Sequence, residues 1–370
     1  MLPMFTRPAL TGIVDALPAT IPFVGPEALE RRSGTALTLR LGANESLFGA
    51  SPRVVAAMQQ AALESQLYGD PEGFALREAL ARHHGVTVDH IVLGAGIDEL
   101  FGVLAQAYLE HGEIAVMSAG AYPTFAYQIR GHGGLIHTTP YRDFRNDPEA
   151  LAELARRVGA KLLYLSNPDN PTGSHLTAAE QQALLDRLPG NCLFVLDEAY
   201  AEFAPAGALP DLASDDPRVI RFRTFSKAHG LAGMRVGYAL GEPALVRPFD
   251  RIRNQFGVGR VTQAAALAAL EDQEFVARVV AETAAGKRDY AELAERHGFG
   301  ALDSATNFVA IDVGSAERAR GILQRLLESE GVFIRMPGVA PLDRCIRVTV
   351  GRPEDRRRFA DAFSRVVAAL

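Results

Sequence analysis

Short apolar runs of β type alternate with helical segments through the first two thirds of the chain. This alternation restricts the possible folds more than any other feature of the sequence. The runs are rich in Val, Ile, Leu and Phe, which is typical of strands buried on both faces. Helices between such strands favour a mostly parallel sheet that is covered on both sides. The expected strands are residues 90–94, 113–118, 134–138, 161–165, 193–196 and 218–223. We therefore predict an α/β domain with a mostly parallel sheet flanked by helices.

The pattern changes after the last of these strands. Helical periodicity covers residues 242–253 and 260–296, and shorter strands then alternate with helices up to the C-terminus. This indicates a smaller α+β domain joined through a long helix. The predicted division is an N-terminal arm with part of the small domain at 1–43, a large domain at 44–250 and a small C-terminal domain at 251–370.

Composition excludes several classes of protein. The chain has 370 residues, 48% of them hydrophobic, and a net charge of −6, which suits two globular domains and gives no nucleic-acid surface. A membrane span needs about 18 consecutive apolar residues, and neither this nor a secretory signal is found. Cys192 and Cys345 lie too far apart in sequence for a disulfide framework or a metal-ligand spacing. We predict a cytoplasmic protein without membrane or nucleic-acid partners.

Polar and glycine-rich segments follow the predicted strands at their carboxyl ends. The carboxyl ends of parallel strands share one edge of a sheet, and open α/β sheets bind ligands there. The segments at this edge are 94–98, 167–173, 197–200 and 226–227. Their convergence predicts one binding site built from all of them.

Lys227 lies in the segment Thr224–Tyr238, TFSKAHGLAGMRVGY. A lysine that acts as a nucleophile must lose its proton near neutral pH, which needs burial or a nearby charge. Arg235 offers a planar guanidinium that suits a phosphate. The hypothesis is that Lys227 forms a Schiff base with pyridoxal phosphate while Arg235 binds the phosphate. The alternative is a solvated lysine and arginine in a loop.

Three further side chains suit the ring of that cofactor. Asp197 ends an apolar strand in LFVLDEAY and can pair with a protonated pyridine nitrogen. Tyr200 can reach the phenolic oxygen, and Asn170 in SNPDNPTG can donate its amide to the same oxygen. The alternatives are an aspartate that caps a turn and a structural Asn-Pro turn.

The segment GAGIDE opens a helix after a strand. Glu99 stands where the third glycine of a dinucleotide fingerprint belongs, so that fingerprint is weak. Backbone N–H groups at a helix start can still bind one phosphate. The predicted phosphate-binding residues are Ala95, Gly96, Ile97 and Asp98.

Four other side chains are candidates. Tyr122 in GAYPTFAY can stack on the pyridine face, although a core tyrosine is an alternative. Arg347 lies between apolar positions of a predicted strand, where a charge needs a partner such as a substrate carboxylate. Arg335 is a second candidate for an anion contact. Tyr68 precedes a turn, and the alternative for it is an ordinary surface tyrosine without a binding role.

With these residues in view, the chain resembles the fold-type I pyridoxal-phosphate aminotransferases of class I/II, and within them the histidinol-phosphate aminotransferase group. The similar segments are NESLFGASP, LYGDPEG, NPDNPTG, LDEAYAEF, TFSKAHGLAGMRVGY and IRVTVG. The resemblance implies the fold-type I architecture, with a large domain around a mostly parallel sheet and a smaller α+β domain.

The resemblance also implies roles at the cofactor. Lys227 would carry the cofactor and move the proton, Asp197 would pair with the pyridine nitrogen, and Asn170 and Tyr200 would hold the phenolate oxygen. Tyr122 would stack on the ring. The phosphate would be held by Ala95 to Asp98, Ser226 and Arg235.

At the substrate, the resemblance implies that Arg347 binds the acid group and that Asn44 lies close by. The family is dimeric, so a homodimer with shared active sites is expected, in which Tyr68 reaches the phosphate of the neighbouring subunit. Three departures occur in this chain: Ile97 lacks the usual hydroxyl, residues 255–259 lack two amides that the group places near the substrate, and Ser46-Leu47 replaces the Asn-Pro of the group.

We predict amino transfer between an amino acid or amino-alcohol phosphate, similar to histidinol phosphate, and a 2-oxo acid. One alternative is a pyridoxal-phosphate-dependent decarboxylase or lyase on the same fold, because sequence does not reveal which substrate bond breaks. Another is a non-enzymatic sensor that binds the cofactor. Such regulators usually add a DNA-binding segment, and residues 1–40 show no helix-turn-helix pattern.

Overall fold

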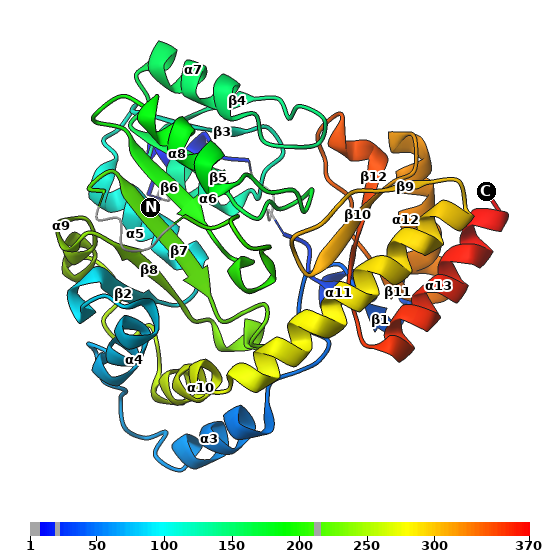
Figure 1. Cartoon of the computed structure of the whole chain (residues 1–370), viewed down its shortest axis with the longest axis horizontal. Coiled ribbons are helices and arrows are strands. Elements are labelled where there is room, and N and C mark those ends of the chain that lie inside the picture. The colour runs from blue at the N-terminus through cyan, green and yellow to red at the C-terminus, as the bar shows by residue number, and fades with distance from the viewer. Residues whose placement is uncertain (1–7, 19–22, 211–215) are drawn as a thin grey trace, which may run out of the picture.

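A seven-stranded sheet forms the centre of the larger part of the molecule (Figure 1). The computed structural model describes residues 8–18, 23–210 and 216–370, so two stretches of the predicted arm, 1–7 and 19–22, lie outside the described residues. The strand order is β2-β8-β7-β6-β5-β3-β4. The strands are β2 (Ile91–Gly94), β3 (Ile114–Ser118), β4 (Leu135–Thr139), β5 (Leu162–Ser166), β6 (Leu193–Asp197), β7 (Val219–Thr224) and β8 (Gly237–Gly241).

The sheet is mostly parallel. Strands β4, β3, β5, β6 and β7 run in one direction, and only β8 pairs antiparallel, with β2 on one side and β7 on the other. Ser166 pairs in register with Asp197, so β5 and β6 end side by side. The α/β fold predicted from sequence is confirmed.

Helices cover both faces of the sheet because its strands alternate their side chains between two apolar layers. Tyr164 and Val195 pack with the helices of one face, whereas Leu163 and Phe194 pack with those of the other. The first face carries α5 (Ile97–Tyr108) and α6 (Thr124–Gly131), and the second carries α7 (Pro148–Val158) and α8 (Ala178–Asp186).

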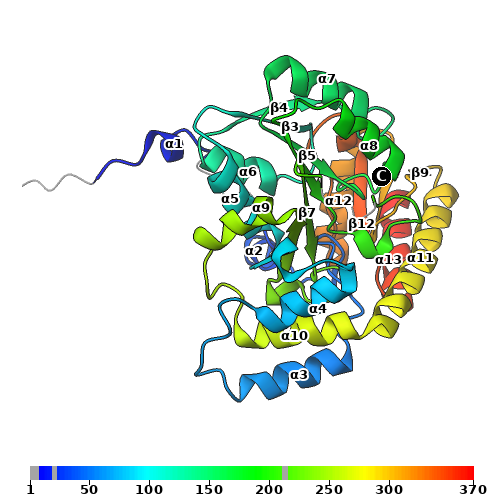
Figure 2. The ribbon, with the colours of Figure 1, turned by 60° about the vertical axis from the view of Figure 1, so that its left-hand side comes forward.

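Further helices gather at the β2 and β8 side of the sheet, and Figure 2 shows them at one end of the molecule. These are α3 (Pro52–Ala62), α4 (Phe74–His84) and α10 (Arg260–Glu271). The predicted start of α3 is confirmed, since the Ser51 side chain accepts a hydrogen bond from Val54 N at 3.2 Å. Shorter pieces are α1 (Gly12–Asp15), α2 (Pro26–Ser33), α9 (Pro243–Val246) and the 3₁₀ turns Val88–His90, Ala201–Phe203, Ala232–Met234, Arg247–Arg251 and Leu342–Arg344.

The second part of the molecule is a smaller α+β unit, as predicted. Its antiparallel sheet has the order β12-β10-β9, and β1 pairs parallel with β11 beside it. Buried side chains such as Ile322, Ile346 and Phe363 form one core between sheet and helices. The elements are β1 (Leu39–Arg40), β9 (Gly300–Ala301), β10 (Phe308–Asp312), β11 (Val332–Phe333), β12 (Cys345–Thr349), α11 (Gln273–Arg296), α12 (Ala316–Glu330) and α13 (Pro353–Ala368).

Two helices predicted from periodicity are wrong in detail. The continuous helix expected at 260–296 is broken at Asp272, whose carboxylate accepts a hydrogen bond from Phe275 N at 3.3 Å and so caps α11. The helix expected at 242–253 is the short α9 followed by a 3₁₀ turn. None of the helices in the described part of the chain is long and apolar enough to cross a membrane.

Candidate active site

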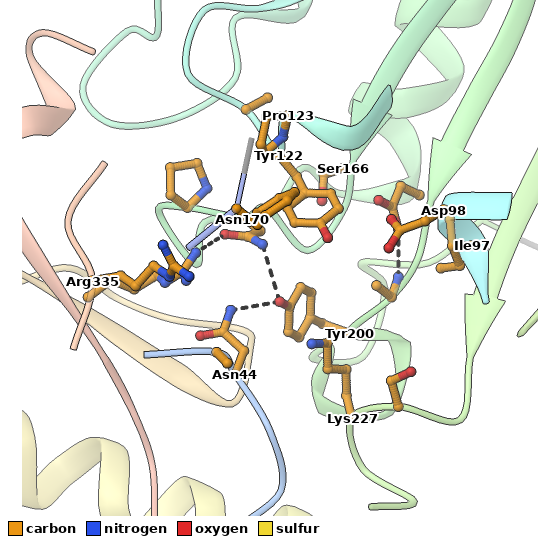
Figure 3. A pocket seen from close by; sticks show the side chains of 18 of the residues that line it. Asn44, Ile97, Asp98, Tyr122, Pro123, Ser166, Asn170, Tyr200, Lys227 and Arg335 are labelled. Carbon is orange, nitrogen blue, oxygen red and sulfur yellow. Dashed lines mark hydrogen bonds between the residues drawn. The ribbon is translucent and has the colours of Figure 1, made fainter. Parts of the chain in front are cut away.

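A cavity of about 770 Å³ opens where β5, β6 and β7 end, and Ser166, Asp197 and Thr224 line it there. The opposite wall carries Arg335 and Arg347 from the smaller unit. Figure 3 shows polar side chains from both units pointing into this space. The cavity therefore lies at the carboxyl edge of the sheet, where the sequence predicts a binding site.

Most of the predicted site residues meet in this cavity. Those that line it are Asn44, Ile97, Asp98, Tyr122, Asn170, Asp197, Tyr200, Ser226, Lys227, Arg235, Arg335 and Arg347.

Ala95, Gly96 and Tyr68 do not line the cavity. The backbone N–H of Ala95 donates to the Glu99 carboxylate, and that of Gly96 donates to Gly94 O at 2.8 Å. Their amides are therefore already engaged. Tyr68 is 79% exposed and packs against Phe256 with ring centroids 4.7 Å apart.

Lys227 provides a free amine in the cavity. Its Nζ lies 5.7 Å from the centroid of the Tyr200 ring, and among the described residues no carboxylate forms an ion pair with it. Burial, helped by the positive charge of Arg347, lowers the pKa of Lys227 to about 8, while Asp98 and Glu45 oppose the shift. A lower pKa leaves more of the amine unprotonated near neutral pH, as a nucleophile requires.

Asp197 is 3% exposed at the end of β6. Its Oδ2 accepts a hydrogen bond from Tyr164 Oη at 2.8 Å, and its Oδ1 accepts one from Ala199 N at 3.0 Å. Burial raises the pKa of Asp197 to about 6, although both hydrogen bonds act in the opposite direction. A buried carboxyl with this pKa gains from a cationic partner such as a protonated ring nitrogen.

The Tyr200 hydroxyl is the centre of a small hydrogen-bond network. Its oxygen accepts from Asn44 Nδ2 at 2.8 Å and from Asn170 Nδ2 at 3.3 Å (Figure 3). A phenol has two acceptor sites and one proton, so these bonds leave the Tyr200 proton available to a ligand oxygen. Asn44 thus contacts Tyr200, whereas the sequence predicted only that it lies near the substrate.

Two arginines of the smaller unit, Arg335 and Arg347, line one side of the cavity. Arg347 donates from Nη1 to Asn170 Oδ1 at 2.5 Å and from Nη2 to Gly42 O at 3.0 Å, while its buried Nε has no partner among the described residues. Arg335 donates from Nη2 to Val24 O at 2.8 Å. Neither guanidinium is paired with a carboxylate in the described part of the chain, so both can bind an anion.

A second cationic corner lies at the start of α5. Arg235 Nη2 is 3.6 Å from Asp98 Oδ2, and Gly96, with φ of 88°, precedes the helix. A Cβ atom at Gly96 would collide with the Arg235 guanidinium, so glycine permits this close approach. Ser226, 7% exposed, adds a hydroxyl. A helix N-terminus beside a guanidinium suits one phosphate group.

The residues present fit pyridoxal phosphate. The cofactor carries a phosphate, a ring nitrogen, a phenolic oxygen and an aldehyde, and the cavity offers a group for each. These are Arg235 with the start of α5, Asp197, Tyr200 with Asn170, and Lys227.

Sequence reasoning missed several residues of the site. Phe23 and Tyr127 line the cavity, with ring centroids 6.2 Å apart in an edge-to-face contact. Tyr164 lies behind Asp197. A tyrosine between leucines of a predicted strand marks Tyr164 as unusual, but it does not reveal Asp197 as its partner. Nothing in the irregular segment around Phe23 links that residue to the sheet.

Comparison with known proteins gives consistent matches over almost the entire chain. Residues 38–363 match the family model described as aminotransferase class I and II. The histidinol-phosphate aminotransferase 2 of Carboxydothermus hydrogenoformans is 36% identical over 96% of this chain and 99% of its own length. The histidinol-phosphate aminotransferase of Symbiobacterium thermophilum is 39% identical over 91% of this chain and 92% of its own length.

A solved structure is also similar. The histidinol-phosphate aminotransferase of Sinorhizobium meliloti, crystallised in complex with pyridoxal-5'-phosphate, is 46% identical over the full length of both chains, with a TM-score of 0.95.

Proposed function

Because the chain belongs to the aminotransferases of class I and II, we propose that it binds pyridoxal 5'-phosphate and transfers an amino group from histidinol phosphate, or a similar donor, to a 2-oxo acid. The observation that carries this proposal is the amine of Lys227 in one cavity with Asp197 and with two arginines, Arg335 and Arg347, that have no carboxylate partner among the described residues. The similarity to relatives named histidinol-phosphate aminotransferase supports this choice of donor.

The proposed roles at the cofactor follow the contacts of the cavity. Lys227 Nζ would hold the cofactor through its aldehyde carbon, and Asp197 would pair with the ring nitrogen. Tyr200 would donate its proton to the phenolic oxygen, while Asn44 and Asn170 hold the Tyr200 hydroxyl in place. Arg235, Ser226, Ile97 and Asp98 form the phosphate site, with Tyr122 beside the ring.

The bound cofactor supplies an electron-withdrawing ring that stabilises negative charge on the substrate carbon. Lys227 Nζ would take the proton from that carbon and deliver it to the former aldehyde carbon of the cofactor, and a pKa of about 8 permits this near neutral pH. Arg335 and Arg347 bind the acid group of the substrate and orient it. For histidinol phosphate that group is the phosphate, and for a 2-oxo acid it is the carboxylate.

The test is a half-reaction on the purified holoenzyme. Histidinol phosphate added without acceptor should convert the aldehyde form of the cofactor to the amine form in stoichiometric amount, and 2-oxoglutarate should restore the aldehyde form. Aromatic amino acids and aspartate serve as comparison donors. Release of carbon dioxide or ammonia without conversion to the amine form would contradict amino transfer.

Lys227→Ala should bind the cofactor without the covalent absorbance band and should lose turnover by at least about a thousandfold.

We further propose that the enzyme is a homodimer with shared active sites. Tyr68 and Phe256 are 79% and 48% exposed, and the nearby Leu63 and Leu67 are 73% and 54% exposed. Such a cluster of exposed apolar side chains is typical of an interface. A second copy that covers it would bring Tyr68 to the neighbouring phosphate site.

The predicted domain division at residues 43/44 and 250/251 and the cytoplasmic location remain part of this proposal.

A further inference from the structure

Tyr164 is a buried phenol that touches a reacting group without lining the cavity. It lies within β5, is 1% exposed, and its Oη is 2.8 Å from Asp197 Oδ2. Asp197 lines the cavity directly. Tyr164 therefore contacts the carboxyl group from outside the cavity lining.

Aromatic neighbours fix the orientation of this phenol. The Phe125 ring stacks on Tyr164 with centroids 4.6 Å apart and an interplanar angle of 18°, and Phe101 packs edge-to-face at 5.7 Å. Both phenylalanines are 0% exposed. In so closely packed a layer, Tyr164 cannot turn its hydroxyl away from Asp197 without displacing a neighbour.

The two hydrogen bonds to Asp197 use different oxygens. Tyr164 donates to Oδ2 and the backbone N–H of Ala199 donates to Oδ1. An ionised carboxylate has about four acceptor sites, so sites on both oxygens stay open toward the cavity. Burial and the neighbouring carboxylate raise the pKa of Tyr164 well above its usual value, so the phenol keeps its proton and remains a donor.

We propose that Tyr164 is a positioning residue for the reaction, which orients Asp197 and weakens its basicity so that the shared proton stays on the cofactor ring nitrogen. This inference rests on the proposed function of the site. A carboxylate that accepts an additional hydrogen bond is a weaker base. Without the phenol, Asp197 would compete better for that proton, and the ring would withdraw fewer electrons.

The principal test is Tyr164→Phe, which removes only the hydroxyl. The holoenzyme is loaded with pyridoxal phosphate labelled with ¹⁵N in the ring, and the nitrogen resonance reports its protonation. The resonance of the variant should move from the protonated toward the neutral position. The dissociation constant of the cofactor should rise about tenfold, as expected for the loss of one hydrogen bond to a charged group.

A matched control is Tyr290→Phe. Tyr290 is also 1% exposed, but its hydroxyl donates to Thr349 O at 3.2 Å in the smaller unit. This variant should leave the ring nitrogen resonance unchanged. If Tyr164→Phe gives the same resonance and the same cofactor affinity as Tyr290→Phe, Tyr164 has only a structural role and the inference is overturned.

If Tyr164→Phe does not fold, a second variant and a second measurement still test the inference. 3-Fluorotyrosine at position 164 keeps the shape and is a stronger donor, so it should lower the pKa of Asp197 below about 6. The ¹³C-labelled carboxyl group can be titrated in the cofactor-free protein for this purpose. An unchanged titration would refute the inference.

The two proposals can also fail separately. A wild-type protein that does not bind pyridoxal phosphate would refute the proposed function, whereas the cofactor-free titration still tests the effect of Tyr164 on Asp197.

Discussion

At the scale of single residues, the Tyr200 hydroxyl links the two ends of the cavity. It accepts from Asn44 and Asn170, and Asn170 in turn accepts from Arg347. The Asn170 amide thus joins Arg347, which we assign to the acid group of the substrate, to Tyr200, which we assign to the phenolic oxygen of the cofactor. A change at Arg347 should therefore affect both ligands.

Arg347→Lys keeps the charge but removes the planar fork, so it cannot reach Asn170 and bind an anion in two places at once. We expect the KM for the donor to rise between about 10- and 100-fold, with a smaller loss in kcat. Steady-state kinetics measures this change. The control is Arg344→Lys, which affects a partly exposed pair with Asp312 and a ring contact with Phe144. Equal effects of both variants would contradict the assignment of Arg347.

Asp197 should make the stability of the cofactor-free protein depend on pH. Its pKa is raised from 3.8 to about 6 in the folded state, so its stabilisation is fully present below about pH 4 and is lost as pH rises through 6. The Asp197→Asn variant does not lose this stability, because asparagine does not ionise. The free energy of unfolding of Asp197→Asn minus that of wild type should therefore increase by about 3 kcal/mol between pH 4 and 7. Urea titrations at several pH values measure it, and a constant difference would disprove the raised pKa.

The sequence predicted most of the residues that line the cavity because each belongs to a short local motif. It did not identify Tyr164 or Phe23. The contact of Tyr164 with Asp197 depends on the register of β5 against β6, and the contact of Phe23 with Tyr127 depends on the path of the N-terminal segment. Register and chain path are tertiary properties that no local pattern encodes.

At the scale of elements, the end of β6 is held by a buried ion-pair cluster. Glu198 follows Asp197 and is 1% exposed. Its Oε1 accepts from Arg221 Nε at 2.9 Å and its Oε2 accepts from Arg223 Nε at 2.8 Å, both from β7. The two arginines lower the pKa of Glu198 in spite of its burial. This cluster joins β6 to β7 next to the site.

Glu198→Gln should destabilise the protein by about 3–5 kcal/mol, because it removes the charge of the carboxylate that pairs with two buried guanidinium groups. Chemical denaturation of the holoenzyme measures the change. Glu153→Gln is the control, since Glu153 pairs with Arg156 on α7 where both side chains are about 60% exposed, and such a pair contributes less than about 1 kcal/mol. A similar effect of both substitutions would contradict this account.

The turn after Lys227 depends on Gly230, with φ of 71°, because a Cβ there would collide with the backbone oxygen of Gly49. Gly34 has a nearly equal φ of 70° but open space around it. Gly34→Ala should cost about 1 kcal/mol of stability from backbone strain alone. Gly230→Ala should cost more and should also weaken cofactor binding, because the loop that carries Lys227 must move. Denaturation and cofactor titration check both, and equal losses would rule out the collision.

Regular elements were predicted well where periodicity was strong, and errors arose where it was weak. Strand β8, Gly237–Gly241, was not predicted because two of its residues are glycine and none is β-branched. The break between α10 and α11 was missed because the apolar pattern continues across Asp272. A single capping side chain ended the helix there, and composition does not reveal such an event.

At the scale of the whole molecule, the cavity lies between the two units, and the apolar cluster around Tyr68 lies outside it. Arg260 donates to Tyr68 O at 3.0 Å and pairs with Glu64 at 3.0 Å. The segment that bears the cluster is therefore tied to the start of α10. The contacts of Arg260 hold the apolar cluster in a fixed position, where a second copy of the chain can bind it.

Phe256→Asp should convert the proposed dimer to monomers, because a charge in the centre of an apolar interface is strongly unfavourable. Sedimentation velocity measures the oligomeric state, and cofactor affinity should fall with it if the sites are shared. Leu370→Asp is the control, since Leu370 is 53% exposed at the C-terminus. A dimer that survives Phe256→Asp would place the interface elsewhere.

The hydrogen bond from Asn44 N to Thr349 Oγ1, at 3.1 Å, joins residues 305 positions apart. During translation, the ribosome must therefore extend the chain past Thr349 before this contact can form. A nascent chain that has just emerged past Lys227 has its reactive amine but lacks both guanidinium groups that we assign to substrate recognition. Premature termination before β12 would remove Arg347, one of the two guanidinium groups that we assign to the substrate acid group.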